Sequence, residues 1–447
     1  MPQVSAPLQN ESSLESTQRK TFYMSYYIMI EIIALFILFL ILVVLLIINK
    51  NILKRGGGLT EDLITKYKNS NFANPFEHKT IMPACTIKIE LSKYSLMSEL
   101  FVPNQANDLL ADASKQQMTI IKEIAVNYTK SVAHKLTSTK QIITNAYTKL
   151  WEIYTLYPVL NDKINAFHMC EAPGTWIQAT DDFAKRKKLS YVWTANSLNP
   201  KNAWVIKTFG KDAFKDEYDL MAKNPDRWIF AIGESGNTGD VTDPAVIKEY
   251  RKLYIGKNIN LVTGDAGMPY MASLELLQTL DYSQCLLTLA VAGIGANCVI
   301  KCFSPFLSSK PESKEAGAWF VNLMYLYCYY FESVILCKPF TSRPTSGEFY
   351  IVGLGFKGIK EPDFAKLCEV QITMKTTPNL IFIPREILPD SFIGQIHDFT
   401  KHLEDFVNEH QLDQQQIAKL VLAKSPAVGE LRKLVNINAE KWIERFK

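Results

Sequence analysis

Short apolar segments alternate with helical patterns through the middle of this chain. The apolar segments cover 164–170, 191–195, 228–232, 259–263 and 297–301. Each has the length of a strand, and stretches with helical periodicity, such as 271–280, separate them. Strands that alternate with helices pack as an open, mainly parallel α/β sheet. Ligands of such sheets bind beyond the carboxyl ends of the strands, so the sequence predicts one site at that edge.

The N-terminal part of the chain carries a long apolar segment. It runs from Tyr23 almost without interruption, and from Ile32 to Ile48 it contains no charged residue. About 20 apolar residues are enough for a helix to cross a bilayer, and the segment is too long for the core of a signal peptide. The sequence therefore predicts a transmembrane helix over 23–49. The alternative is a core helix of the soluble body, but nothing nearby in the sequence would bury all its faces.

The flanking charges favour a cytosolic location for the C-terminal body. Lys50, Lys54 and Arg55 follow the apolar segment, whereas Arg19 and Lys20 precede it, so the positive-inside bias is small. We expect a single-pass membrane protein whose catalytic domain faces the cytosol, in a cell membrane or in a virion or viral-factory membrane. The triplet 10–12 (Asn-Glu-Ser) is a glycosylation sequon that would then lie on the far side.

Changes in composition divide the chain into segments. The N-terminal tail is polar and rich in Ser and Gln, as in disordered segments, and the last part shows amphipathic helical patterns at 397–409 and 414–424. The predicted parts are a disordered tail (1–22), a transmembrane helix (23–49), a juxtamembrane linker (50–115), a catalytic α/β domain (116–360) and a helical C-terminal extension (361–447). The extension carries no catalytic constellation and is a possible surface for a protein partner.

Composition excludes several classes of protein. The 447 residues are 47% hydrophobic and 21% charged, which is typical of a globular protein, and the net charge of +4 is too small to establish a polyanionic partner. The eight cysteines are scattered, with no pattern of a disulfide framework or a zinc site. We therefore expect reduced thiols and no metal centre.

The segment Cys170-Glu-Ala-Pro-Gly174 lies between a predicted strand and a predicted helix. Small residues let a ligand approach the backbone closely, and the start of a helix offers unpaired N–H groups. Such a turn suits the carboxylate and ribose of an amino-acid-bearing nucleoside. An ordinary structural turn explains the same residues equally well.

Four ionisable residues lie at or near predicted strand ends: Lys149, Asp265, Lys301 and Glu348. An amine with a reference pKa near 10.4 is a poor base at neutral pH unless it is desolvated or placed beside another cation. Two lysines and two acids in a half-buried site would let one lysine accept the proton of an alcohol while the others orient it. Taken singly, each residue is more typical of a surface ion pair.

These segments resemble the FtsJ/RrmJ-like family of RNA ribose 2′-O-methyltransferases. The family's CEAPG turn is similar to 170–174, its Lys-Asp-Lys-Glu tetrad corresponds to the four residues above, and its KP-SR-E-Y pattern to Lys338-Pro, Ser342-Arg343, Glu348 and Tyr350. The resemblance covers about residues 140–356. It implies a Rossmann-like methyltransferase sheet with an antiparallel last strand and S-adenosyl-L-methionine as cofactor. It also implies that Lys301 is nearest to a general base, tuned by Asp265 and Glu348, while Lys149 steers the ribose.

The resemblance also implies binding residues. We expect substrate RNA at Ser342 and Arg343. We expect the cofactor at Cys170, Glu171, Ala172, Pro173, Gly174, Thr175, Trp176, Asn196, Asp240, Val241 and Asp265. Three residues depart from the family pattern, which has Asp at His168, Gly at Thr175 and an acid at Asn196. The basic run 185–188 could contact RNA phosphates, or it is simply the solvated end of a helix.

The favoured function is that of a membrane-anchored RNA 2′-O-methyltransferase, acting at the 5′ cap of mRNA. The membrane anchor suggests a large cytoplasmic DNA virus as its source. The alternative is a catalytically inactive, membrane-anchored RNA-binding or assembly protein that retains the fold, which His168, Thr175 and Asn196 would allow. A base N-methyltransferase is disfavoured because Gly264-Asp-Ala-Gly-Met-Pro-Tyr270 lacks that class's Asn/Asp-Pro-Pro-aromatic motif.

Overall fold

A computed structural model describes residues 60–69, 77–80, 113–125, 144–210, 216–234, 236–267, 274–304, 313–377 and 380–446. The chain divides into two compact units, 1–66 and 67–447, and the sheet lies in the second. The predicted transmembrane helix and the sequon lie outside the described residues. Among the helices that are described, none has the length and apolarity needed to cross a membrane.

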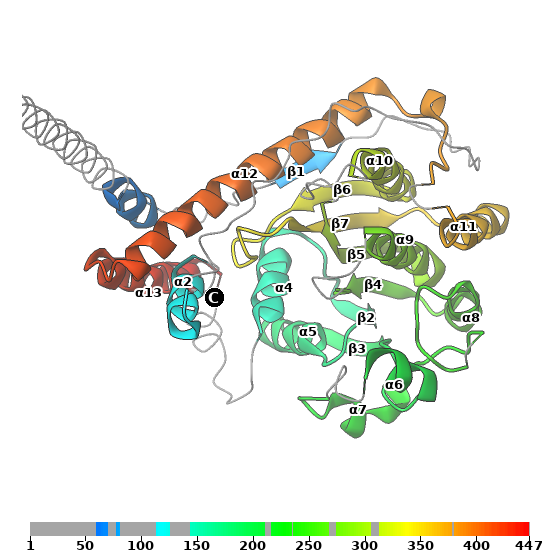
Figure 1. Ribbon diagram of the computed structural model, residues 1–447. Coiled ribbons are helices and arrows are strands. Elements are labelled where there is room, and N and C mark those ends of the chain that lie inside the picture. Colours follow the sequence, from blue (N-terminus) through cyan, green and yellow to red (C-terminus); the bar gives the residue numbers. More distant parts are fainter. Residues whose placement is uncertain are drawn as a thin grey trace, which may run out of the picture. The chain divides into compact units, whose positions relative to one another are not determined.

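Seven strands form one sheet in the order β1-β6-β7-β5-β4-β2-β3 (Figure 1). Neighbours from β3 through β2 and β4 to β5 run parallel, whereas β7 is antiparallel to β5 and β6, and β1 is antiparallel to β6. The strands are β1 (Glu77–Thr80), β2 (Lys163–Met169), β3 (Ser190–Ala195), β4 (Ile259–Gly264), β5 (Ala292–Phe303), β6 (Phe331–Cys337) and β7 (Glu348–Phe356). The α/β sheet and its antiparallel last strand are confirmed. Five strands share one direction, and the sheet is mixed because β7 and the additional edge strand β1 run opposite to them.

The strand predicted at 228–232 is wrong. Only Trp228 forms a β-bridge, with Ala195, and the Ile229 N–H donates to the carbonyl of the same Ala195. The 3₁₀ turn η3 (Pro225–Arg227) precedes this segment. A second turn, closed by the bridge between Gly233 and Gly236, follows it. The apolar segment therefore lies along the edge of β3 without extending the sheet.

Helices cover both faces of the sheet, because side chains along each strand alternate between the faces. On β5, Cys298, Ile300 and Cys302 belong to one hydrophobic cluster, whereas Val299 belongs to the other. The first cluster includes side chains of α8 (Pro244–Tyr254), α9 (Leu274–Val291), α10 (Ser313–Tyr330), α11 (Glu361–Met374) and α12 (Asp390–Leu422). The second includes side chains of α4 (Asn145–Leu156), α5 (Thr175–Lys187) and α13 (Ala427–Phe446). The short helices α6 (Ala203–Phe209) and α7 (Leu220–Lys223) follow β3.

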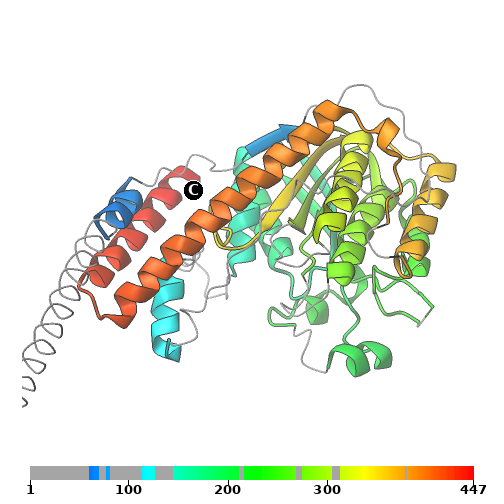
Figure 2. The same cartoon turned by 45° about the horizontal axis from the view of Figure 1, so that its top comes forward.

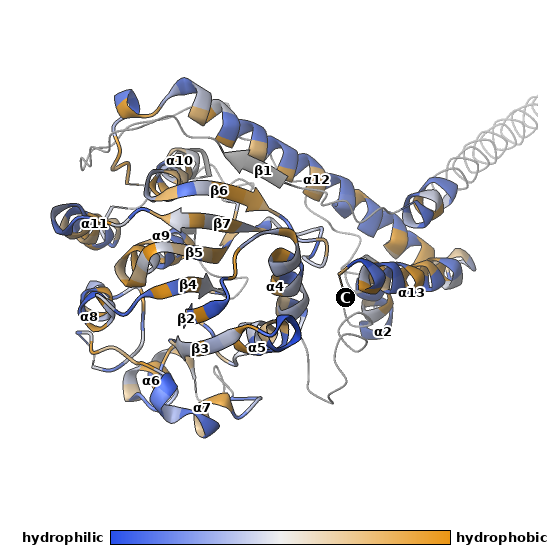
Figure 3. Cartoon of the chain, turned by 180° about the vertical axis from the view of Figure 1, so that it is seen from behind, coloured by the Kyte–Doolittle hydropathy of each residue, from blue (hydrophilic) through white to orange (hydrophobic). Residues whose placement is uncertain are grey.

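The C-terminal extension is helical, as predicted, but its two predicted helices form a single one. Helix α12 continues through 410–413, a segment that contains no Gly or Pro to end it. Hydrophobic and hydrophilic residues alternate along its length (Figure 3). It runs from the helices of the first cluster to α13 and to α2 (Lys115–Ala125) (Figure 2). The indole N–H of Trp151 on α4 donates to the Phe446 carbonyl at 2.9 Å, so α13 is attached to the same face of the sheet as α4.

Candidate active site

The pairing of β5 with β7 brings the predicted catalytic residues of these strands to one face. Lys301 lies opposite Tyr350, and Phe303 lies opposite Glu348. Side chains two residues apart on a strand share a face, so Lys301, Tyr350 and Glu348 all point toward the α4 layer. Asp265 directly follows β4, where Gly264 pairs with Ile300 of β5. Register alone therefore places Asp265 beside Lys301.

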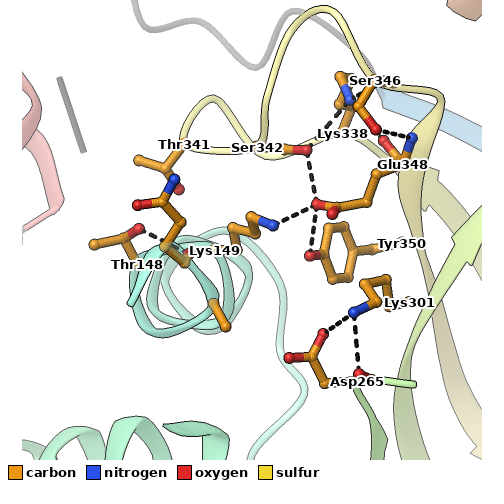
Figure 4. Close-up of polar contacts among 12 residues, drawn as sticks. Thr148, Lys149, Asp265, Lys301, Lys338, Thr341, Ser342, Ser346, Glu348 and Tyr350 are labelled. Carbon is orange, nitrogen blue, oxygen red and sulfur yellow. Dashed lines mark hydrogen bonds and ion pairs between the residues drawn. The ribbon is translucent and has the colours of Figure 1, made fainter. Parts of the chain in front are cut away.

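Two ion pairs form at this edge of the sheet. Lys301 Nζ lies 2.7 Å from Asp265 Oδ1 and also donates to the Asp265 carbonyl at 3.0 Å. Helix α4 contributes Lys149, whose Nζ donates to Glu348 Oε1 at 2.6 Å. The same carboxylate oxygen accepts hydrogen bonds from Ser342 Oγ and Tyr350 OH, both at 2.9 Å. Figure 4 shows the Tyr350 ring between the two ion pairs, so the predicted tetrad is assembled in one place.

The charges of the two pairs set the protonation of this cluster. Burial alone would raise the pKa of Glu348, but Lys149, Lys301 and Lys338 hold it well below its usual range, so this residue is a carboxylate. Burial alone would lower the pKa of Lys301, but Asp265 and Glu348 together raise it above its usual value. In this arrangement Lys301 is an ammonium group.

A lysine that accepts the proton of an alcohol must first give up its own, and this arrangement favours the charged form of Lys301. Each lysine of the tetrad has its own carboxylate, Glu348 for Lys149 and Asp265 for Lys301. A carboxylate partner favours the charged amine, in contrast to the neighbouring cation that the sequence argument assumed.

Lys338 is a further buried cation that the sequence argument left without a role. It follows β6, is 1% exposed, and donates from Nζ to Ser342 Oγ (3.2 Å), the Ser346 carbonyl (2.7 Å) and the Glu348 carbonyl (2.6 Å). Burial, with a contribution from Lys149 and against that of Glu348, lowers the pKa of Lys338 to about 7. Its position directly before Pro339, in the segment quoted for the family pattern, was the only signal in the sequence.

The loop 338–347 also holds the two residues predicted to bind substrate. The hydroxyl of Ser342 is engaged on both sides, since it accepts from Lys338 and donates to Glu348. Arg343 is exposed on the same loop. The structure therefore gives Ser342 an internal role beside the tetrad and leaves Arg343 facing solvent.

Glu171 closes the turn 170–174 over the start of α5. Its Oε1 accepts from the backbone N–H groups of Trp176 (2.6 Å) and Ile177 (3.1 Å), and Gly174 precedes the helix with φ of 108°. A positive φ of this kind favours glycine. Its other oxygen, Oε2, is buried without a hydrogen-bond partner among the residues that the structure describes. Burial first, and then the nearby Asp265, raise the pKa of Glu171 well above its usual value.

Asn196 joins this turn to the segment that contains Asp240. Its amide nitrogen donates to the Gly239 carbonyl (3.0 Å) and to Tyr250 OH (2.7 Å), and its oxygen accepts from the Cys170 N–H at 3.4 Å. Burial, followed by the carboxylate of Asp240, raises the pKa of the Cys170 thiol to about 12, which places Asp240 near the turn. The turn and the 239–241 segment therefore lie together, as predicted.

Other residues of the predicted cofactor site face the protein interior. Trp176 is fully buried beside Tyr350 and donates from its indole to the Ala146 carbonyl at 2.9 Å. Val241 is 3% exposed within the first hydrophobic cluster. Thr175 is buried and meets Tyr218 OH at 3.5 Å.

His168 replaces the acid of the family pattern without leaving an unpaired group. Its Nδ1 lies 2.6 Å from Thr263 Oγ1 on β4, and its Nε2 lies 2.7 Å from Tyr191 OH on β3. Burial lowers the pKa of His168 to about 3, so the imidazole is neutral at physiological pH. The residue thus links three neighbouring strands under the turn.

Gln284 on α9 contacts the end of β5 and the residues just after β4, from the face of the sheet opposite α4. Its Nε2 donates to the Lys301 carbonyl at 3.3 Å, and its Oε1 accepts from the Ala266 N–H at 3.4 Å. A Cβ at Gly264 would lie 2.7 Å from the same Oε1, so a larger residue here would displace the Gln284 amide. This contact could not be predicted from sequence, because α9 is apolar apart from scattered polar residues.

The basic run 185–188 forms the end of α5. Lys185 pairs with Asp181, Arg186 lies over the Trp151 ring, and Lys187 lies over the Phe183 ring. These contacts are those of a solvated helix end, and the proposed phosphate contact stays a prediction.

Known proteins resemble this chain over the same region. Residues 142–356 match the family model described as FtsJ-like methyltransferase. An uncharacterized protein of Acanthamoeba polyphaga mimivirus is 31% identical over 51% of this chain and 28% of its own length. The cap-specific mRNA (nucleoside-2′-O-)-methyltransferase 2 of Mus musculus is 25% identical over 85% of this chain and 49% of its own. A probable methyltransferase of African swine fever virus is 27% identical, over 62% and 64%. The chain thus spans less than two thirds of each relative.

Proposed function

We propose that the chain is an FtsJ-like methyltransferase that methylates the ribose 2′-hydroxyl of RNA, with the 5′ cap of mRNA as acceptor, and the match of residues 142–356 to the FtsJ-like family model supports this. The proposal rests on two ion pairs at the carboxyl edge of the sheet, Lys149–Glu348 and Lys301–Asp265. The name of the mouse relative supports the cap as substrate.

Proteins of the FtsJ-like family use S-adenosyl-L-methionine as methyl donor. The residues here fit such a group. The unpaired Oε2 of Glu171 suits an ammonium group, and the carboxylate of Asp240 suits a hydroxyl or amine donor. When bound, the cofactor supplies an electrophilic methyl group. The turn 170–174 and the 239–241 segment would hold it.

The chain's own residues would bind and activate the acceptor. Lys149 and Lys301 present ammonium groups from opposite sides of Tyr350 and can orient a ribose hydroxyl. Lys301, once it has passed its proton to solvent, would accept the hydroxyl proton, and Asp265 and Glu348 would stabilise the ammonium group that results. The internal hydrogen bonds of Ser342, Tyr350 and Lys338 keep Glu348 in place during this step.

Methyl transfer to short RNA tests the proposal. The full chain, with S-adenosyl-L-methionine carrying a labelled methyl group, is incubated with capped RNA, with uncapped RNA of the same sequence and with capped RNA already methylated at the first 2′-oxygen. We expect label on the 2′-oxygen of the capped RNA only, located by nuclease digestion and mass spectrometry. Transfer to uncapped RNA as well would retain the ribose and reject the cap.

The alternative is a catalytically inactive RNA-binding or assembly protein that retains the fold. It predicts no label on any RNA and no binding of the cofactor or its demethylated product in calorimetry. Binding of the cofactor without transfer would instead indicate a different acceptor or a required partner subunit. The intact tetrad favours the enzyme, since a binding protein has no need of one buried and one partly buried ion pair side by side.

We further propose that 23–49 anchors the protein in a membrane with the catalytic domain in the cytosol. The support is the apolar segment and its flanking charges. Expression of the full chain should place it in the membrane fraction after carbonate extraction, with 67–447 digested by protease added to the cytosolic side of sealed vesicles. Recovery in the soluble fraction would reject the anchor, and protection of the C-terminal body would reverse the orientation.

A further inference from the structure

Glu152 is a buried carboxylate that the tetrad does not use. It lies on α4 one turn after Lys149, and its side chain is fully buried. Its Oε1 accepts from the Phe340 N–H at 2.6 Å, and its Oε2 accepts from the Thr341 N–H at 3.3 Å and from Thr341 Oγ1 at 3.4 Å. Helix α4 therefore holds the loop 338–347 through Glu152 at Phe340 and Thr341, and it holds the first residue of β7 through Lys149 at Glu348.

The same carboxylate contacts the C-terminal helix. The indole N–H of Trp442 on α13 donates to Glu152 Oε2 at 3.3 Å. Trp442 is fully buried and packs on Phe446, with ring centroids 4.7 Å apart. Trp442, which is 290 positions downstream of Glu152, thus fixes the orientation of the carboxylate that holds the loop.

Attachment of α13 to α4 does not require this carboxylate. The bond from Trp151 to the Phe446 carbonyl already joins the two helices, and apolar packing in the second cluster supports it. Burying a carboxylate is costly, and burial raises the pKa of Glu152 to about 7 against the effect of its four hydrogen-bond donors. Each of these donors is an uncharged N–H or O–H group. Three of the four donors belong to the loop 338–347, and one belongs to α13. The hydrogen bonds of Glu152 therefore orient the loop more than they attach the helix.

We propose that Glu152 is a positioning residue which, oriented by Trp442 of α13, fixes the loop 338–347 so that Glu348 meets Lys149. The C-terminal extension is then part of the catalytic assembly. The expected effect on kcat rests on the proposed function. The expected effect on the loop does not. A misplacement of about 1 Å at a catalytic group lowers turnover by about 100-fold, so small shifts of this loop matter.

Two matched variants separate positioning from attachment. Trp442→Phe removes the N–H to Glu152 and keeps an aromatic ring in the core, whereas Trp151→Phe removes the N–H to Phe446 and leaves the carboxylate untouched. We expect Trp442→Phe to lower kcat by about 3- to 10-fold with an unchanged KM for the cofactor, and Glu152→Gln to lower it by about 10- to 100-fold. Trp151→Phe should keep kcat.

Hydrogen exchange of the full chain gives a readout that does not depend on activity. Amides of 338–347 should exchange faster in Glu152→Gln and Trp442→Phe than in Trp151→Phe, because the loop loses its acceptor or the orientation of that acceptor. Equal exchange in this loop for all three variants would overturn the inference even if the protein is a methyltransferase. Faster exchange without any methyl transfer in the parent chain would uphold the inference and reject the proposed function.

Discussion

Replacement of Lys301 by alanine is expected to lower the single-turnover rate of methyl transfer by about 10²- to 10⁴-fold. The residue is 12% exposed in its side chain, bonded to both the carboxylate and the carbonyl of Asp265, and lies across the strand from Tyr350. The variant loses the group that accepts the hydroxyl proton and leaves Asp265 without its cation. Rapid-quench measurement with saturating RNA and labelled cofactor gives the rate directly.

Lys301→Arg is the matched control, since arginine keeps the positive charge but stays protonated at every accessible pH. It should restore folding and cofactor binding but not the rate. The parent rate should rise with pH throughout the neutral range, because Asp265 and Glu348 raise the pKa of Lys301 and leave little free amine at pH 7. A rate in Lys301→Arg close to that of the parent, or a parent rate that is flat between about pH 6 and 9, would assign the residue an electrostatic role only.

The positions of the tetrad followed from sequence because strand ends are local features. Asp265 follows an apolar segment that is β4, and Lys301 lies near the end of β5, so a parallel sheet places them side by side whatever the rest of the chain does. The pairing of Glu348 with Lys149 needed the family resemblance, because it joins residues 199 positions apart through a helix and a hairpin.

The buried polar partners could not be predicted in the same way. Lys338, Glu152 and Gln284 act through hydrogen bonds to backbone groups of distant segments, and a backbone N–H or carbonyl leaves no trace in the sequence. The protonation of Lys301 could not be predicted from sequence for a related reason. Its charge depends on which carboxylate lies nearest, and this is decided by register and side-chain direction. Trp228 to Ile232 has the composition of a strand, but the turns on either side leave it only one bridge to β3.

Replacement of Glu348 by glutamine is expected to destabilise the fold by about 3–5 kcal/mol at pH 7, as well as to abolish activity. The carboxylate faces Lys149 directly and lies close enough to Lys301 and Lys338 for all three to lower its pKa. Without the charge of Glu348, the three lysines have Asp265 as the remaining carboxylate of the tetrad. Urea denaturation of the full chain, followed by intrinsic fluorescence, measures the difference in the free energy of unfolding.

The pH dependence gives the sharper test of this electrostatic origin. The folded-state pKa of Glu348 lies below its usual value of 4.5, so its charge contributes stability above pH 4.5 that is lost as the pH falls toward the folded-state pKa. The difference between parent and Glu348→Gln should therefore be largest at neutral pH and shrink below pH 4.5. Tyr350→Phe, which removes one neutral hydrogen bond to the same oxygen, should cost only about 1 kcal/mol and show no such pH dependence. Suppose that Glu348→Gln loses no more stability than Tyr350→Phe at pH 7. Solvent would then already screen the charges of this cluster, and the tetrad would not be buried and preorganised.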